Sequence, residues 1–227
     1  MMPLSWNRHP AVNYHYEEGK AWLSQSKRGK RCTALSYAAF EFRLAIERIV
    51  FQYWFTINKN EINESNVSDV RSYKRMQNKI FKLGGNQNEI KKHFELIQLI
   101  LDNLQIDTKL AIPDLGKLHN HYDSCSELCH ITWTIAPKER KFLKQVFGEL
   151  EEIEETLGSY TKGLTSFPTI ADERFKEIQQ QFIKEEIGTP EVIAYLKKIG
   201  VWAIKSDNKG ENKEFIGTPI EPEKTMK

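Results

Sequence analysis

The sequence predicts an all-α protein, an up-and-down helical bundle with one long central helix. Along most of the chain, apolar residues recur at intervals of three and four, which is the period of a helix buried on one side. Residues 31–57 carry such stripes on two opposite sides, and at 1.5 Å per residue they would form a helix about 40 Å long. A helix that is apolar on two sides is expected at the centre of a bundle.

The two stripes of this central helix enclose a pair of charged residues. Arg43 and Glu47 lie four residues apart on the boundary between the stripes. They could be partly buried charges that satisfy each other and fix the register of the helices, or Arg43 could be held toward a cleft, ready to bind phosphate. One stripe contains Leu35, Ala39, Phe42, Ile46, Ile49 and Tyr53, and the other contains Tyr37, Phe40, Leu44, Phe51 and Phe55.

Start and stop signals divide the rest of the chain into further helices. The basic turn Arg28-Gly29-Lys30 ends a first short helix, and Gly84-Gly85 ends a helix after the central one. Asn86 and Glu89 have the spacing of a capping box, and a Pro before Asp114 opens the next helix. The expected helices cover residues 14–26, 67–83, 86–104, 115–136, 143–164, 171–186 and 189–199.

These helices suggest four regions along the chain. Residues 1–13 are expected to be irregular, 14–165 to form the bundle, 166–200 to add C-terminal helices, and 201–227 to form a tail or a small hairpin. Two short apolar runs flank the polar stretch SDNKGENK, as in a hairpin. Low hydrophobicity and Pro219 favour a disordered tail instead.

The helix expected at 143–164 keeps a three-four apolar repeat over three heptads. This repeat could be the seam of a homodimer, but packing inside the bundle is the favoured interpretation, because bundle helices commonly show such stripes. Five glutamates crowd the middle of the same helix, and we interpret them as a solvated face rather than a metal site. They are Glu149, Glu151, Glu152, Glu154 and Glu155.

Composition limits the classes of function. The formal net charge is +2, from 33 Lys and Arg against 31 Asp and Glu, so any site for a polyanion must be local. The apolar central segment carries four charged residues, which excludes a membrane span there. Three cysteines are an odd number for a disulfide framework and fit a reducing compartment. We therefore expect a cytoplasmic protein without a membrane contact.

The segment LGKLHNHYDSCSELCHITW is the first place to look for chemistry. Its polar residues at helical spacing could supply general acid and base groups or a ligand set, or could simply be a wet helix face. That stripe contains His119, Asp123, Ser126 and His130. Cys125, Cys129 and His121 could instead bind zinc, but cysteines on an apolar helical stripe usually behave as small hydrophobes. We predict neither a metal nor a cofactor, since no zinc knuckle, phosphate loop or nucleophile elbow occurs in the sequence.

Three runs of sequence resemble the HEPN superfamily (higher eukaryotes and prokaryotes nucleotide-binding), in particular bacterial members near defence systems. The runs are YHYEEGKAWL, ALSYAAFEFRLAIERIVF, which contains Arg43 and Glu47, and LGKLHNHYDSCSELCHITW. The resemblance covers residues 14–165 and implies a helical bundle, often dimeric, that acts in many members as a metal-independent RNA endonuclease. Active members carry an arginine, four to six residues and then a histidine.

This sequence departs from that motif in its histidine-rich helix. No arginine lies between Asp114 and Pro137, and the one literal match, Arg8 with His15, precedes the expected bundle. Our leading hypothesis is therefore a HEPN-like protein that binds RNA or a partner protein, in a bacterial stress or phage-defence setting. Its binding residues would be Arg43, Glu47 and His121.

Two alternatives stay open. The first is a metal-independent ribonuclease that uses His119, Asp123, Ser126 and His130, with Arg43 stabilising the developing phosphorane charge. The second is a helical scaffold outside this superfamily.

Overall fold

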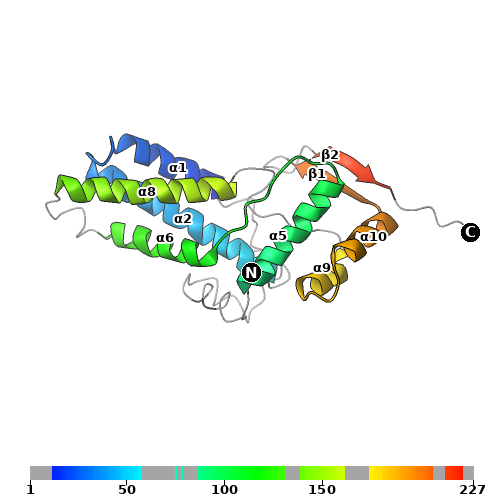
Figure 1. Cartoon of the computed structure of the whole chain (residues 1–227). Coiled ribbons are helices and arrows are strands. Elements are labelled where there is room, and N and C mark those ends of the chain that lie inside the picture. The colour runs from blue at the N-terminus through cyan, green and yellow to red at the C-terminus, as the bar shows by residue number, and fades with distance from the viewer. Residues whose placement is uncertain are drawn as a thin grey trace, which may run out of the picture. The chain divides into compact units, whose positions relative to one another are not determined.

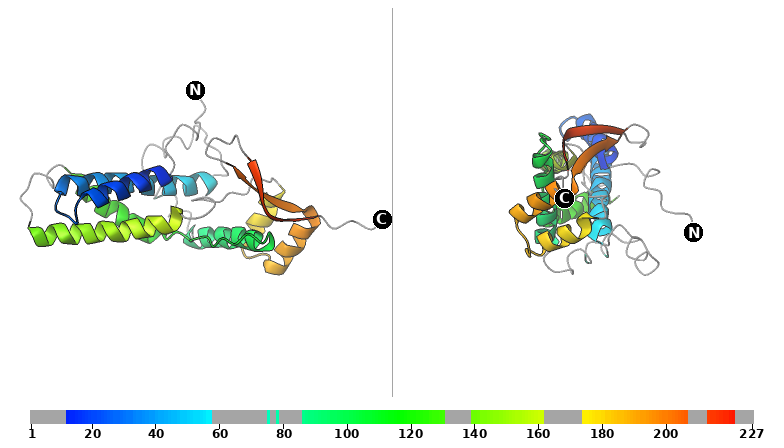
Figure 2. Two further views of the ribbon diagram at one scale, coloured as in Figure 1. Left: turned by 90° about the horizontal axis from the view of Figure 1, so that it is seen from above. Right: turned by 90° about the vertical axis from the view of Figure 1, so that its right-hand side faces the viewer.

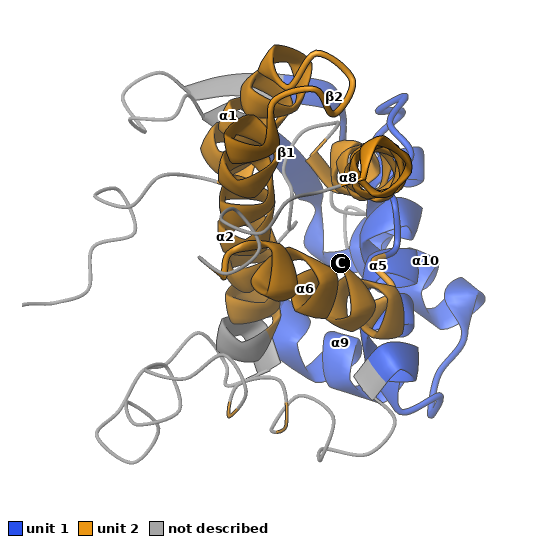
Figure 3. Cartoon of the chain, turned by 90° about the vertical axis from the view of Figure 1, so that its left-hand side faces the viewer, with its two compact units in different colours: residues 1–7, 85–112, 168–227 blue, residues 8–84, 113–167 orange. Residues whose placement is uncertain are grey.

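The structure, a computed structural model, describes residues 12–57, 75, 78, 86–130, 139–161, 174–206 and 213–221. The chain divides into two compact units, coloured separately in Figure 3. Unit 1 comprises Met1–Asn7, Gly85–Ile112 and Pro168–Lys227, and unit 2 comprises Arg8–Gly84 and Pro113–Phe167. The described regular structure is helical apart from one two-stranded sheet, so the prediction of an all-α fold is confirmed.

Unit 2 contains four described helices arranged around the long central one. They are α1 (Val12–Gln25), α2 (Cys32–Ile57), α6 (Leu115–Leu128) and α8 (Arg140–Thr161). Helix α2 contacts each of the other three, as Figure 1 shows. Its first apolar stripe is fully buried from Leu35 to Tyr53, as predicted. Helices α1 and α2 approach closely at Gly19, where a Cβ atom would lie 2.5 Å from the ring of Phe42.

The second stripe of α2 is not buried in the same way. Tyr37 and Phe40 are exposed, Leu44 and Phe51 are half-buried, and the side chain of Phe55 lies outside the described residues. Helix α2 therefore packs against α1, α6 and α8 through the side that carries its first stripe. An aromatic flank of the longest helix stays open to solvent.

The apolar repeat of α8 is used inside unit 2. Val146, Leu150, Ile153 and Leu157 are almost completely buried, and α8 contacts both α1 and α2. The favoured interpretation of this repeat, packing inside the bundle, is confirmed. The glutamates on the other side of α8 are mostly exposed.

Unit 1 consists of α5 (Asn86–Asn103), α9 (Phe175–Ile183), α10 (Thr189–Ile199) and a hairpin of β1 (Val201–Ser206) and β2 (Lys213–Ile220). Residues 86–112 of the range expected to form one bundle thus belong to this unit. The hairpin is antiparallel, with Val201 opposite Ile220, so the hairpin forms rather than a disordered tail. The helix expected over 67–83 lies outside the described residues, apart from positions 75 and 78. The core of unit 1 contains Leu96, Phe175, Phe182, Val192 and Leu196.

Candidate nucleic-acid interface

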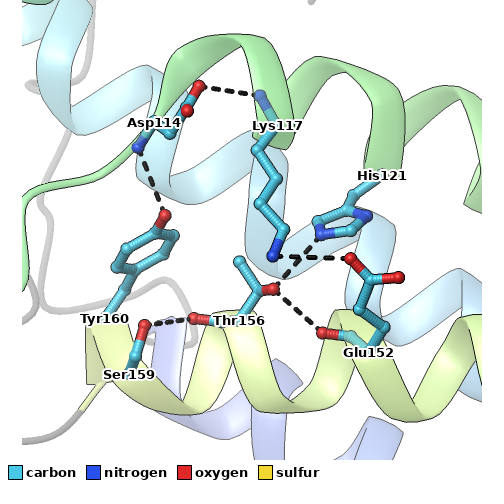
Figure 4. A network of polar contacts seen from close by, with 7 residues as sticks. All are labelled: Asp114, Lys117, His121, Glu152, Thr156, Ser159 and Tyr160. Carbon is cyan, nitrogen blue, oxygen red and sulfur yellow. Dashed lines mark hydrogen bonds and ion pairs between the residues drawn. The ribbon is translucent and has the colours of Figure 1, made fainter.

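His121, expected to bind a ligand, belongs to a polar seam between α6 and α8 (Figure 4). The imidazole is buried, and its Nε2 lies 3.3 Å from Thr156 Oγ1. Because the Thr156 hydroxyl donates to the carbonyl of Glu152 at 2.9 Å, His121 Nε2 must be the donor to Thr156. Burial lowers the pKa of His121, Lys117 lowers it further, and Glu152 opposes them. The neutral imidazole thus holds two helices together.

The same seam extends toward the beginning of α6. The carboxylate of Asp114 accepts a hydrogen bond from the backbone N–H of Lys117, which caps the helix. The backbone N–H of Asp114 donates to Tyr160 Oη at 3.2 Å, and Lys117 Nζ lies 3.4 Å from a carboxylate oxygen of Glu152. We call the contacts of Asp114, Lys117 and His121 with Glu152, Thr156 and Tyr160 the α6–α8 seam.

Arg43 and Glu47 interact along α2, as one of the two interpretations of the sequence expected. Arg43 Nε lies 3.2 Å from Glu47 Oε1, and the guanidinium lies over the ring of Tyr122 on α6, 5.0 Å from its centre. Burial alone would lower the pKa of Arg43, but Tyr122 and Glu47 raise it above its usual value. The cation is thus held between two helices by a carboxylate and a ring.

The polar stripe of α6 is only partly brought together. His119 Nε2 and Asp123 Oδ2 are 3.5 Å apart on an exposed face, whereas Ser126 Oγ donates to the carbonyl of Tyr122 on its own helix at 2.7 Å. His130 lies beyond the end of α6 and is exposed. Arg43 contacts Tyr122 from α2 and also influences the pKa of Cys129, which burial raises. It makes no described contact with His119, Asp123 or His130.

One buried contact between a histidine and a carboxylate was missed from the sequence. His15 Nδ1 on α1 lies 2.8 Å from Glu41 Oε2 on α2, and both side chains are largely buried. Arg8, its literal motif partner, lies outside the described residues. Glu41 falls beside the second stripe of α2, so a charge next to an apolar stripe was the signal that could have indicated this contact.

The turn between α1 and α2 has an unusual backbone and composition. Four of the five residues 27–31 are Lys or Arg, and Lys27 and Arg28 have φ values of 53° and 56°. Left-handed conformations cost roughly 1–2 kcal/mol for each residue that is not glycine. The buried Ser26 stabilises the turn, because its carbonyl accepts from Arg31 at 2.9 Å and its hydroxyl accepts from Gly29 at 3.3 Å. The turn is therefore held in shape while its cations remain exposed.

This turn packs against the beginning of α8. Gly29 has a φ of +83°, and a Cβ atom there would lie 2.6 Å from the carbonyl oxygen of Leu143. Figure 2 shows the turn and the first residues of α8 at the same end of unit 2. The first turns of α8 carry three more exposed cations, at Arg140, Lys141 and Lys144. The basic end of unit 2 consists of Lys27, Arg28, Lys30, Arg31, Arg140, Lys141 and Lys144.

The cations of the basic end are not neutralised by described carboxylates. Within the described ranges, none of the seven has an ion pair, although Glu139 adjoins Arg140 in sequence. Both α2 and α8 begin at this end, so the positive ends of two helix dipoles point toward it. Arg140, Lys141 and Lys144 therefore oppose the dipole of their own helix. The positive charge of this end is therefore concentrated in one place.

Aromatic side chains accompany these cations. Phe142, between the cations of α8, is 38% exposed. Trp22, in the last turn of α1, packs against Tyr37 of α2 with ring centres 4.8 Å apart, and Tyr37 is 50% exposed. Exposed rings beside exposed cations are the combination that binds phosphates and unpaired bases.

Sequence reasoning identified the basic turn but did not connect it with α8. The two segments are separated by more than 100 residues, and their contact depends on the direction in which α8 runs. A local signal was nonetheless present, because α8 begins with cations and carries its glutamates later, the reverse of what its dipole favours.

No protein-family model, curated protein or solved structure matches this chain. The three cysteines are free thiols, and among the described residues no three His, Cys, Asp or Glu side chains gather as they would around a metal ion. Cys125 and Cys129 lie toward α2, whereas His121 lies against α8. No helix in the part of the chain that the structure describes has the length and apolar character of a membrane span.

Proposed function

We propose that unit 2 binds single-stranded RNA at its basic end. The observation that carries this proposal is the gathering, around one turn, of seven cations from two distant segments that form no ion pair with a described residue. Each phosphate neutralised by such a cation releases counterions, which favours binding at low salt. The chain as a whole has a net charge of only +2, so this affinity belongs to one place on the surface.

The arrangement of the charges supports a binding role over a stabilising one. Cations in the first turn of α8 destabilise that helix, and two left-handed basic residues strain the turn. Neither feature benefits folding. An anion bound at this end would offset the electrostatic cost, because it screens the repulsion between the cations and meets the positive helix ends.

The exposed rings favour unpaired nucleotides over a regular duplex. Phe142 and the adjacent rings of Trp22 and Tyr37 can each receive a base that is splayed out of a strand. Single-stranded RNA offers such bases together with a flexible backbone that can follow a curved set of cations. The resemblance to the HEPN superfamily, which implies a role beside nucleic acid, points in the same direction.

Fluorescence anisotropy with a labelled oligouridylate of about 20 nucleotides tests the proposal. The variant Lys27→Gln, Arg28→Gln, Lys30→Gln, Arg31→Gln should bind about 100-fold more weakly at low salt, and the slope of log affinity against log salt should become shallower by about 3. The matched control changes four cations of unit 1, as Lys176→Gln, Lys184→Gln, Lys197→Gln and Lys198→Gln, and should bind as the unaltered protein does. Equal losses in the two variants would contradict a localised site.

Two further arms of the experiment define the ligand and the chemistry. Single-stranded DNA of the same sequence and an RNA duplex show whether the sugar or the pairing state is recognised. Electrophoresis of the RNA after incubation in EDTA tests the ribonuclease alternative. Fragments that disappear in the His119→Ala, His130→Ala double variant would identify a metal-independent nuclease that uses the stripe of α6, whereas intact RNA leaves binding as the function.

A further inference from the structure

Two adjoining cavities lie within unit 1, where α9 and α10 pack on α5. Their volumes are about 470 and 370 Å³, and Glu95, Phe182 and Thr189 line both of them. Figure 3 shows the three helices within this unit. We call the two cavities together the unit 1 groove.

Part of the lining of the unit 1 groove is apolar. Phe182 belongs to the buried core of the unit, and Ile187 and Leu99 pack against this core while they stay half-buried. Leu110 is also half-buried, and Ile112 is 39% exposed. The groove therefore leaves apolar surface open beside the core.

The charged side chains of the lining are acidic with one exception. Lys92 Nζ lies 3.3 Å from Glu95 Oε2 and 3.2 Å from Glu185 Oε1, so two carboxylates share the one cation of the lining. One positive group against five negative ones leaves a formal charge of −4. Three carboxylates of the lining form no ion pair with a described residue, namely those of Asp102, Glu186 and Glu191.

The segment between α9 and α10 forms a wall of fixed backbone shape. The N–H of Glu185 donates to the carbonyl of Phe182 at 3.1 Å, and the N–H of Glu186 donates to the carbonyl of Gln181 at 2.9 Å. This pair of hydrogen bonds is the Schellman pattern, in which glycine is the usual residue at the left-handed position. Glu185 holds that position with a φ of 60°. The wall thus carries two adjacent carboxylates on a backbone that is ordered before any ligand binds.

We propose that the unit 1 groove binds a basic amphipathic helix of a partner protein. Apolar side chains of that helix, spaced at three and four residues, would fill the groove beside Phe182. Lysines and arginines along its borders would pair with the carboxylates of Asp102, Glu186 and Glu191. The same carboxylates repel the phosphates of RNA, so charge complementarity favours a basic peptide. This inference does not depend on RNA binding by unit 2.

Fluorescence anisotropy of the full chain with a labelled helical peptide of about 14 residues, with leucine on one face and lysine on the other, tests the proposal. The variant Asp102→Asn, Glu186→Gln, Glu191→Gln should bind this peptide at least about tenfold more weakly. The matched control removes three exposed carboxylates of α8, as Glu149→Gln, Glu151→Gln and Glu155→Gln, and should bind as the unaltered protein does. Equal losses in the two variants, or no binding by the unaltered chain, would overturn the proposal.

A second set of measurements tests the apolar part of the groove. Ile112→Ser should weaken peptide binding about fivefold, while Phe40→Ser, at a similarly exposed site of unit 2, should not change it. A peptide with serine in place of leucine should bind the unaltered chain at least about tenfold more weakly. Circular dichroism verifies that the variants are folded, and if Ile112→Ser is not, the serine peptide decides.

Two other occupants of the groove would give different results. Spermidine that displaces the peptide as well as unlabelled peptide does would indicate a site for simple cations. Self-association in sedimentation equilibrium that is lost in the Asp102→Asn, Glu186→Gln, Glu191→Gln variant would assign the groove to a second copy of the chain. Either result would overturn the proposal.

Discussion

The two ends of α8 differ in whether their polar and charged side chains have partners. At the α6–α8 seam, near the end of α8, each of the six residues contacts a partner on the opposite helix, as Thr156 contacts His121 and Tyr160 contacts Asp114. At the basic end, where α8 begins, seven cations have no carboxylate partner among the described residues. A seam whose polar groups are satisfied stabilises a fold, whereas charges that repel one another and oppose a helix dipole indicate a ligand. Substitutions can therefore separate the two roles along one helix.

The largest change in stability should follow from Gly29→Ala at the joint between the basic turn and α8. Its φ of +83° and the close carbonyl oxygen of Leu143 leave no room for a Cβ atom. We expect a loss of about 2–3 kcal/mol in the free energy of unfolding, measured by urea titration. Gly148→Ala is the control, because a Cβ atom at this position of α8 would meet nothing within 4 Å. It should stabilise α8 by about 1 kcal/mol, and equal losses in the two variants would argue against a strained joint.

A smaller loss is expected from Thr156→Val within the α6–α8 seam. The change removes the acceptor of the buried His121 without changing the volume much. An unpaired buried donor costs about 1–2 kcal/mol. RNA affinity should not change, because the seam is remote from the basic turn along α8. Ser159→Ala, at an exposed hydroxyl of the same helix, should change the unfolding free energy by less than about 0.5 kcal/mol.

The seam should also give the fold a dependence on pH. Because burial lowers the pKa of His121 in the folded state below its value in the unfolded chain, the unfolded chain binds a proton first as the pH falls. Stability from this site is complete above about pH 6.5 and is lost as the pH falls from there through the folded pKa. The urea midpoint of unfolding should fall between pH 6.5 and a pH below the folded pKa of His121, and this fall should be smaller in His121→Gln than in the unaltered protein. His130→Gln, at an exposed imidazole, serves as the control, and an identical loss in all three proteins would assign the effect elsewhere.

The smallest expected change in the free energy of unfolding comes from charge reversal at the beginning of α8, and its sign distinguishes a binding role from a stabilising one. Arg140→Glu and Lys141→Glu place carboxylates in the first turn of α8, where its dipole favours them. Each should raise the free energy of unfolding by about 0.3–1 kcal/mol and weaken RNA binding about tenfold. Thermal melts and anisotropy on the same samples measure both. Destabilised variants that bind RNA normally would mean that these cations support the fold.

The outcome for individual residues shows what a periodic pattern can predict. The first stripe of α2 and the repeat of α8 are buried as predicted, because spacing at three and four fixes which side of a helix is apolar. The same pattern could not reveal that the second stripe of α2 stays open, since burial depends on how many helices pack on each side. The pairing of Arg43 with Glu47 could be predicted from the sequence, because the two residues are one helical turn apart. The position of the Tyr122 ring beside Arg43 could not.

The sequence by itself determined that the protein is helical, where most described helices begin and end, and that its turn at residues 27–31 is basic. These properties depend on neighbours within a few residues, through periodicity, caps and glycines. The tertiary structure alone decided that the basic turn meets the start of α8, that His15 pairs with Glu41, and that His121 binds Thr156. Such contacts join residues far apart in the chain, and they form because burying the apolar stripes fixes the direction and register of the four described helices of unit 2.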